Sequence, residues 1–211
     1  MLAIIPARGG SKGIPNKNIK IFDNEPLIAY TIEAAKKSKF VSKIVCSTDS
    51  EEISEVAREY NAEVPFLRPK ELAKDDSKAI DNYLYSIPKY NEYYNCEYEN
   101  FVVLQPTSPL RIAEDIDNAI SLFNSKKADS VISFSEMTHP PSWAKTIDEN
   151  LNVKDYFSNN YHGRNRQDIP RAYIPNGAIF VFNYFKLKKL KKYYNNKTYA
   201  YIMPLEGAID I

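Results

Sequence analysis

The chain has 211 residues, with 28 Lys and Arg against 27 Asp and Glu, so its formal net charge is +1. A protein that neutralises a nucleic-acid backbone needs a large excess of basic residues, so we expect no nucleic-acid partner. Two cysteines are too few for a disulfide framework, and we find neither an apolar run long enough for a membrane span nor a signal-peptide pattern. We therefore expect a single domain over residues 1–211, cytoplasmic and with no membrane partner.

Short apolar runs alternate with segments of helical period along most of the chain. Strands are expected at residues 2–7, 43–48, 63–67, 101–105, 130–134, 177–183 and 200–204. Helices are expected at residues 26–39, 78–94, 112–123 and 184–193. A further helix should follow Asp49, which can cap it because Glu52 completes a capping-box-like pattern. This alternation predicts an α/β fold with a doubly wound, mainly parallel sheet, in which ligands bind at the carboxyl ends of the strands.

Residues from about 137 to 175 interrupt the alternation. They are rich in Pro, Asn, Asp and Arg and show no clean period. Long irregular segments in compact domains are often functional. We expect this segment to be an insertion or cap within the single domain.

The first strand leads directly into a loop of glycines and cations, Ala7 to Asn18. Its glycines are Gly9, Gly10 and Gly13, and its cations are Arg8, Lys12 and Lys17. Glycines let a backbone approach a ligand closely and turn its N–H groups toward an anion, and the cations suit a triphosphate. Lys12 is followed by Gly13 and not by Ser or Thr, so the loop is no Walker A motif, and its adjacent glycines exclude GxGxxG. An exposed turn is the alternative interpretation, but this density of glycines and cations at a strand end favours a phosphate site.

The same loop carries a family resemblance. ARGGSKGIPNKN at residues 7–18 resembles the N-terminal motif of the CMP-sialate synthetases, or acylneuraminate cytidylyltransferases, and of the bacterial enzymes that activate legionaminic and pseudaminic acids. The similarity continues, in the family's order, through VCSTDSEEI (45–53), FLRPKELAKDDS (66–77), LQPTSPLR (104–111), IPNGAIF (174–180) and the terminal AIDI.

The resemblance implies a reaction and a fold. Enzymes of this family couple CTP to a nine-carbon 2-keto acid sugar and release pyrophosphate, with Mg²⁺ as cofactor. The implied fold is nucleotide-diphospho-sugar transferase-like with a protruding dimerisation segment, here residues 137–175, and the implied assembly is a homodimer.

The resemblance also assigns nucleotide contacts. Arg8, Ser11 and Lys17 should contact the triphosphate, and the backbone near Pro6 and Ala7 should lie close to the cytosine. Further nucleotide contacts are implied for Asn18 and Arg68. Asp210 matches the first aspartate of a metal-binding Asp-x-Asp, so Arg8, Lys17 and Asp210 are the implied catalytic residues, with Asp210 as the metal ligand. The sequence ends at Ile211, where the resemblance expects a second aspartate next and then a final helix.

On the sugar side, the resemblance implies that Gln105 and Arg111 contact substrate hydroxyls or the carboxylate. Taken alone, Arg111 could equally be a surface residue at a turn that enters a helix. Arg166 falls where the family places an arginine on the sugar carboxylate, but Arg164 and Arg171 flank it, and the spacing does not choose among the three.

Asn176 and Phe180 are the remaining implied substrate contacts. Phe180 stands where several family members have tyrosine, and Ile174 where many have arginine. A more apolar sugar side would favour a deoxy diamino sugar such as legionaminate or pseudaminate. Two alternatives stay open: another sugar nucleotidyltransferase, for example one that uses 3-deoxy-manno-octulosonate, and a non-catalytic nucleotide-binding protein.

Overall fold

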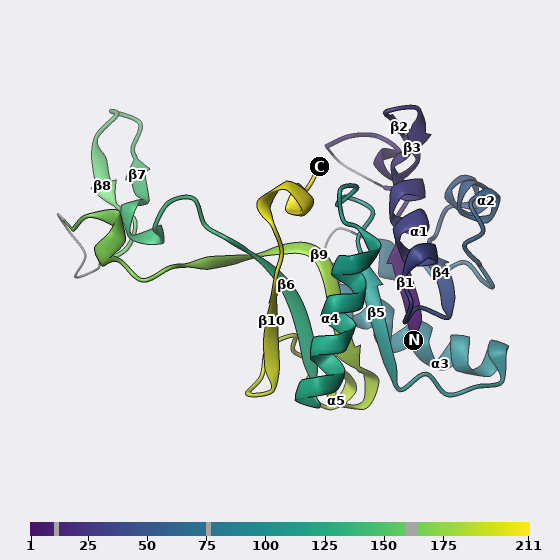
Figure 1. Cartoon of the computed structure of the whole chain (residues 1–211). Coiled ribbons are helices and arrows are strands. Elements are labelled where there is room, and N and C mark those ends of the chain that lie inside the picture. Colours follow the sequence, from purple (N-terminus) through teal and green to yellow (C-terminus); the bar gives the residue numbers. More distant parts are fainter. Residues whose placement is uncertain (11–12, 75–76, 159–163) are drawn as a thin grey trace.

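The computed structural model describes residues 1–10, 13–74, 77–158 and 164–211. Its centre is a six-stranded sheet in the order β10-β6-β9-β5-β1-β4 (Figure 1). The strands are β1 (Leu2–Pro6), β4 (Lys43–Ser47), β5 (Asn100–Leu104), β6 (Ser130–Glu136), β9 (Tyr173–Asn183) and β10 (Thr198–Ile202). The helices are α1 (Leu27–Lys37), α2 (Glu51–Glu59), α3 (Ala79–Tyr94), α4 (Ala113–Lys126) and α5 (Tyr184–Leu190). Two small hairpins, β2 (Ile21–Phe22) with β3 (Glu25–Pro26) and β7 (Lys145–Ile147) with β8 (Val153–Asp155), lie outside this sheet.

Helices cover both faces of the sheet, as the sequence predicts. The apolar stripes of α1, α2 and α4 pack on one face in a cluster that includes Ile32, Ala57 and Ile120. On the other face, α3 and α5 pack against aromatic and aliphatic side chains, including Tyr83 and Leu187. Because alternate residues of a strand point to opposite faces, neighbouring apolar residues of β1 contribute to both clusters. The doubly wound α/β prediction is therefore confirmed.

One strand runs against the others. β1 pairs in parallel with β4 and β5, and β10 pairs in parallel with β6, but β9 is antiparallel to both β5 and β6. β9 is also longer than the strand expected at residues 177–183, because Tyr173, Ile174 and Pro175 pair with the end of β6. The start of β9 thus lies at the edge where β5 ends, with Leu104 opposite Ile179.

Two local predictions near β4 are wrong. Residues 63–67 form no strand; only Glu63 makes a bridge, to Val45, and the pairing ends before Pro65, which has no N–H to donate. Asp49 does not cap α2. Ser50 does, because its hydroxyl accepts a hydrogen bond from Ile53 N, and the Asp49 carboxylate is thereby left for other partners.

The segment between β6 and β9 leaves the body of the molecule. In Figure 1 the β7–β8 hairpin stands well apart from the sheet, at the end of two extended stretches that continue β6 and lead into β9. Its large apolar side chains are exposed: Trp143, Ile147, Leu151, Val153, Tyr156 and Phe157. No helix of the described residues has both the length and the apolar character needed to cross a membrane.

Candidate nucleotide-binding site

Three segments meet at one edge of the sheet because of the strand directions. β1 and β5 are parallel neighbours, so the loops that follow them leave from the same edge, and the antiparallel β9 begins there. Gly177 has a φ of +78°, and a Cβ added to it would lie 3.2 Å from Gln105 Oε1. A glycine at this position thus allows both the left-handed backbone and the close approach of the Gln105 side chain.

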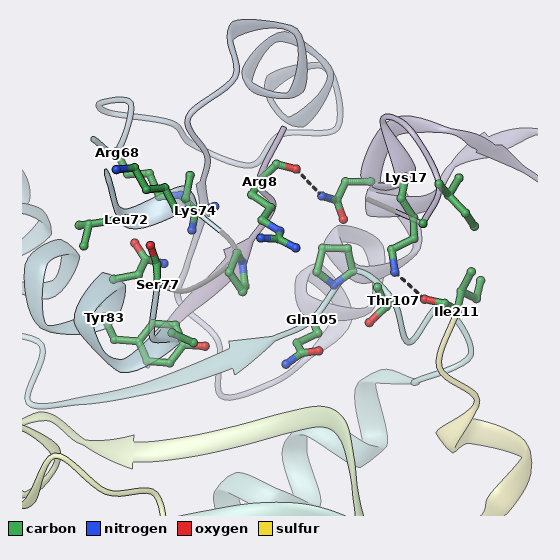
Figure 2. Close-up of a pocket in the computed structure, with 18 residues that line it drawn as sticks. Arg8, Lys17, Arg68, Leu72, Lys74, Ser77, Tyr83, Gln105, Thr107 and Ile211 are labelled. Atoms are coloured by element: carbon green, nitrogen blue, oxygen red, sulfur yellow. Dashed lines mark hydrogen bonds between the residues drawn. The ribbon is translucent and has the colours of Figure 1, made fainter. Parts of the chain in front are cut away.

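A cavity of about 630 Å³ opens at this edge. Figure 2 shows that its walls come from the loop after β1, the segment before α3, α3 itself and the loop after β5. The lining residues that carry polar or charged side chains are Arg8, Lys17, Asn18, Arg68, Lys74, Ser77, Asn82, Tyr83, Gln105 and Thr107. This volume falls within the range of roughly 300–1,000 Å³ typical of small-molecule sites.

The cavity is strongly cationic. Its lining includes the side chains of Arg8, Lys17, Arg68 and Lys74, whereas no acidic side chain among the described residues lines it. Fixed charges of one sign in a cleft raise the local concentration of counter-ions and attract anions. The arrangement suits a ligand with several negative charges, as the glycine-cation loop predicts. Ser11, the other triphosphate contact implied by the resemblance, lies outside the described residues.

The predicted nucleotide contacts of the first loop are held by main-chain hydrogen bonds. Asn18 is buried, and its Nδ2 donates to the Arg8 carbonyl over 3.0 Å. Lys17 Nζ donates to the Ile211 carbonyl over 2.6 Å, which brings the last residue to the cavity wall. Pro6 lines the cavity directly, while Ala7 is buried beside it, with its N–H bound to the Ser47 carbonyl. The loop is thereby fixed against β4.

Asp49 links the glycine loop to Arg68. Its Oδ1 accepts a hydrogen bond from Gly9 N over 3.1 Å and lies 3.7 Å from Arg68 Nη2. The backbone of Arg68 is held as well, because its N–H donates to the Thr48 carbonyl over 2.8 Å. Burial lowers the pKa of Arg68, and the negative charge of Asp49 opposes that effect. Sequence reasoning treated Asp49 only as a helix cap, and its long-range role follows from the parallel pairing of β1 with β4.

Arg111 is buried and is not among the residues that line the cavity. The side chain is 2% exposed, so the interpretation as a surface residue is wrong. Its Nη1 donates to the carbonyls of Gln105 and Ala178 over 3.1 and 2.8 Å, and its Nη2 donates to Thr31 Oγ1 over 2.6 Å. Burial lowers the pKa of Arg111 to about 9, so the guanidinium stays charged at neutral pH. These contacts tie the loop that carries Gln105 to the start of β9.

Two other predicted sugar contacts, Asn176 and Phe180, make contacts with residues of the central sheet. Asn176 Oδ1 accepts from Ser133 Oγ and Ala178 N, and its Nδ2 donates to Ser135 Oγ, so the amide spans β6 and β9. Phe180 stacks on Phe182, with ring centroids 6.1 Å apart. Neither residue is among those that line the cavity, whereas Gln105 is.

The three arginines of the irregular segment lie elsewhere in the chain. Arg166 opens a 3₁₀ turn, Arg166–Asp168, and lines a separate cavity of about 500 Å³ with Glu136, Met203 and others. Arg171 Nη1 lies 3.5 Å from Glu136 Oε2, and Arg164 is exposed. Within one chain, the structure does not bring any of them to the cavity that Gln105 lines.

The described residues form no preorganised metal site. No group of three or more His, Cys, Asp or Glu side chains among them could hold a metal ion. Asp210 is exposed and directly precedes Ile211, which lines the cavity. Mg²⁺ at phosphate sites commonly takes one or two carboxylates and completes its shell with phosphate oxygens and water. A single carboxylate beside a cationic cavity therefore fits a magnesium ion that arrives with a triphosphate.

The sequence did not lead us to expect that residues of α3 and of the segment before it line the cavity. Asn82 and Tyr83 come from the first turns of this helix, and Lys74 and Ser77 come from the segment before it. A signal was present in the sequence: Asn82 and Ser86 are four residues apart, on a helix whose other buried residues are mostly apolar or aromatic. A polar pair on a buried helix face indicates a ligand or a polar network.

Comparison with known proteins identifies the family. Residues 2–206 match the family model described as cytidylyltransferase. The chain belongs to the cytidylyltransferase family. The N-acylneuraminate cytidylyltransferase of Escherichia coli O18:K1:H7 is 37% identical over 212 residues, which cover all of this chain and 49% of that protein. The CMP-N,N'-diacetyllegionaminic acid synthase of Legionella pneumophila is 36% identical over 214 residues, all of this chain and 90% of that protein.

The share of each relative that the chain covers differs between the relatives. The chain spans about half the length of the N-acylneuraminate cytidylyltransferases it resembles. Among solved structures, a CMP:2-keto-3-deoxy-manno-octonic acid synthetase complexed with CTP superimposes with a TM-score of 0.68 at 15% identity, over 96% of this chain and 90% of that one. At this identity the likeness concerns the fold, and it agrees with the α/β architecture of this cytidylyltransferase-family member.

Proposed function

We propose that this chain transfers CMP from CTP to a nine-carbon 2-keto acid sugar and releases pyrophosphate. The observation that carries the proposal is the cationic cavity, which combines Arg8, Lys17 and Arg68 with Gln105 at the carboxyl edge of the sheet. Membership of the cytidylyltransferase family and relatives that bear the names of sialate and legionaminate enzymes support it.

In the proposed reaction, the anomeric hydroxyl of the sugar attacks the α-phosphorus of CTP, and pyrophosphate leaves. Negative charge then spreads over the bridging and leaving oxygens. Arg8 and Lys17 bind the triphosphate and stabilise this charge, and Asn18 keeps the Arg8 backbone in place. Gln105 orients a sugar hydroxyl, and Arg111 holds the Gln105 carbonyl. Asp210 would hold Mg²⁺, which orients the phosphates and offsets their charge.

The proposal extends to a homodimer formed through residues 137–175. Six large apolar side chains of this segment, from Trp143 to Phe157, are exposed in the single chain, and exposed apolar patches of this kind are typical of protein interfaces. A partner that covers them would also be needed to bring Arg164, Arg166 or Arg171 near a sugar. Light scattering on the purified protein tests this assembly, and the mass of one chain at micromolar concentration would refute it.

The reaction is tested by pyrophosphate release from the full-length protein with CTP and Mg²⁺. Sialic, legionaminic and pseudaminic acids are offered separately, and GTP serves as the control nucleotide. Release with CTP and one sugar is the expected result, and it names the sugar. In the single chain Phe180 packs on Phe182 and is not among the residues that line the cavity. No release with any sugar, from folded protein that binds CTP, would contradict the proposal.

Asp49→Asn is expected to weaken CTP binding about tenfold, the effect of losing ~1.4 kcal/mol of charge-assisted interaction. The asparagine oxygen can still accept from Gly9 N, but Arg68 loses the negative charge beside it. Calorimetric titration with CTP measures the change. Glu51→Gln, which removes an exposed carboxylate two residues away, is the matched control and should leave the affinity unchanged. Equal affinities in the two variants would contradict the role of Asp49.

A further inference from the structure

Asn82 occupies an unusual place for an amide. It is the fourth residue of α3 and is 2% exposed. It packs against the carboxyl end of β4, where Ser47 lies. Ser47 from β4 and Ser86 from the next turn of α3 are buried on either side of it, at 1% and 0% exposed. Buried amides are normally hydrogen-bonded on both their oxygen and their nitrogen, so the partners of each atom are informative.

The carboxamide oxygen is fully used. Asn82 Oδ1 accepts one hydrogen bond from Ser47 Oγ and one from Ser86 Oγ, each over 3.1 Å. An amide oxygen has two lone pairs, so these serines occupy its accepting capacity and fix the orientation of the amide. The NH₂ group must then point away from them.

The amide nitrogen has no acceptor within the described part of the chain, and Asn82 lines the cationic cavity. The Asn82 NH₂ group is thus a donor of fixed orientation that lines the cavity and has no acceptor among the described residues. Among the described residues, Nδ2 is not one of the fully buried polar atoms that lack a partner, so it is open to the cavity, and covering it is unfavourable unless the ligand or a water accepts from it. The ligand group that faces Asn82 must therefore be a hydrogen-bond acceptor.

The cavity has two different ends. Figure 2 shows Arg68, Leu72, Lys74, Ser77 and Tyr83 on one side of Arg8, and Lys17, Thr107 and Ile211 on the other. Tyr83 is adjacent to Asn82 in α3, so the free amide belongs to the end that offers an aromatic ring and an aliphatic side chain. Such a surface suits a nucleobase, whereas Lys17 at the opposite end suits phosphate oxygens.

We propose that Asn82 reads the nucleotide base, with its Nδ2 donating to the N3–O2 edge of cytosine. This inference rests on the proposed function. Cytosine presents two acceptors there, N3 and O2. Uracil presents the same O2 but carries a hydrogen on N3, so it sets a donor against the Asn82 donor. The held amide thus selects CTP over UTP by an unfavourable contact as well as a favourable one.

The test is calorimetric binding of CTP and of UTP, each with Mg²⁺, to the full-length protein and its variants. The wild type is expected to prefer CTP by tenfold or more. Asn82→Ala should lose most of this preference through weaker CTP binding, while UTP binding stays nearly constant. Asn82→Asp, which replaces the donor by an acceptor of the same shape, should shift the ratio further toward UTP.

Ser86→Ala is the matched control, because it removes one support of the amide oxygen and leaves Nδ2 in place. It should keep a CTP preference within about threefold of the wild type, since the bond from Ser47 remains. Circular dichroism establishes that each variant is folded, and Asn82→Asp, being isosteric, serves if Asn82→Ala does not fold.

The outcomes separate the two proposals. An unchanged CTP-to-UTP ratio in folded Asn82→Ala or Asn82→Asp would overturn base reading and leave Asn82 as a tie between α3 and β4. Equal binding of CTP and UTP by the wild type would also overturn it, without affecting the nucleotide site. Binding of neither nucleotide by the wild type would overturn the proposed function together with the inference.

Discussion

Lys17→Ala is expected to lower turnover with CTP by a factor of about 10²–10³, the range found when one group that stabilises transition-state charge is removed. Lys17 lines the cavity at the end of the glycine-cation loop, on the same side of the cavity as Thr107 and Ile211. In the proposed reaction, charge accumulates on the leaving oxygens as the triphosphate breaks, and the ammonium group of Lys17 stabilises this charge. Arg8→Ala should have an effect of similar size, because Arg8 lies in the middle of the same cavity.

The matched control is Lys20→Ala. Lys20 is only three residues from Lys17, but it is exposed and does not line the cavity. Its replacement changes the net charge of the protein by the same amount and should leave turnover within about twofold, since distant exposed charges are screened by salt. Initial rates of pyrophosphate release at saturating CTP measure all three variants. Equal rates in Lys17→Ala and Lys20→Ala would refute the assignment of Lys17 to the triphosphate.

The periodic elements could be predicted from the sequence because their signals are local. The apolar stripe of α1 and the buried runs of β1, β4 and β5 depend on residues a few positions apart, and each element was found within a few residues of its place. The glycine-cation loop was recognisable for the same reason, since its chemistry is concentrated in one stretch that follows one strand.

The direction of β9 could not be predicted in this way. The sequence of a strand that is buried on both faces is apolar whether its neighbours are parallel or antiparallel, so the pattern does not indicate direction. The antiparallel pairing decides where Asn176 lies, since it puts the start of β9, and not its end, beside Gln105. The glycine at position 177 is a local sign of this arrangement, because its positive φ favours glycine and the Gln105 side chain approaches it closely.

The roles of individual polar side chains depended on contacts across long sequence separations. Asp49 meets Gly9 forty residues away, and Asn82 meets Ser47 thirty-five residues away. The local pattern indicated a simpler role for Asp49 as a helix cap, and in the structure Ser50 fills that role. Only the parallel pairing of β1 with β4 brings the carboxylate to the glycine loop.

Arg111 is the position where a structural role should be measurable most directly. Its guanidinium binds two carbonyls and one hydroxyl from three separate parts of the chain, and removal of the side chain leaves the carbonyls of Gln105 and Ala178 without this partner in a buried place. Arg111→Ala is therefore expected to lower the free energy of unfolding by about 2–5 kcal/mol, from lost charge-assisted bonds and a cavity. The midpoint of urea unfolding, followed by circular dichroism, gives this value.

Two further variants separate scaffold from substrate contact. Arg171→Ala removes an arginine that is 75% exposed, and stability should change by less than about 0.5 kcal/mol. Arg111→Lys keeps the positive charge but not the fork that reaches three acceptors at once, so its stability should lie between those of the wild type and Arg111→Ala. If Arg111→Ala instead unfolded at the wild-type urea concentration and lost turnover, the guanidinium would act on the substrate. Loss of stability in proportion to the bonds removed would place Arg111 in the scaffold, where it fixes the loop that presents Gln105.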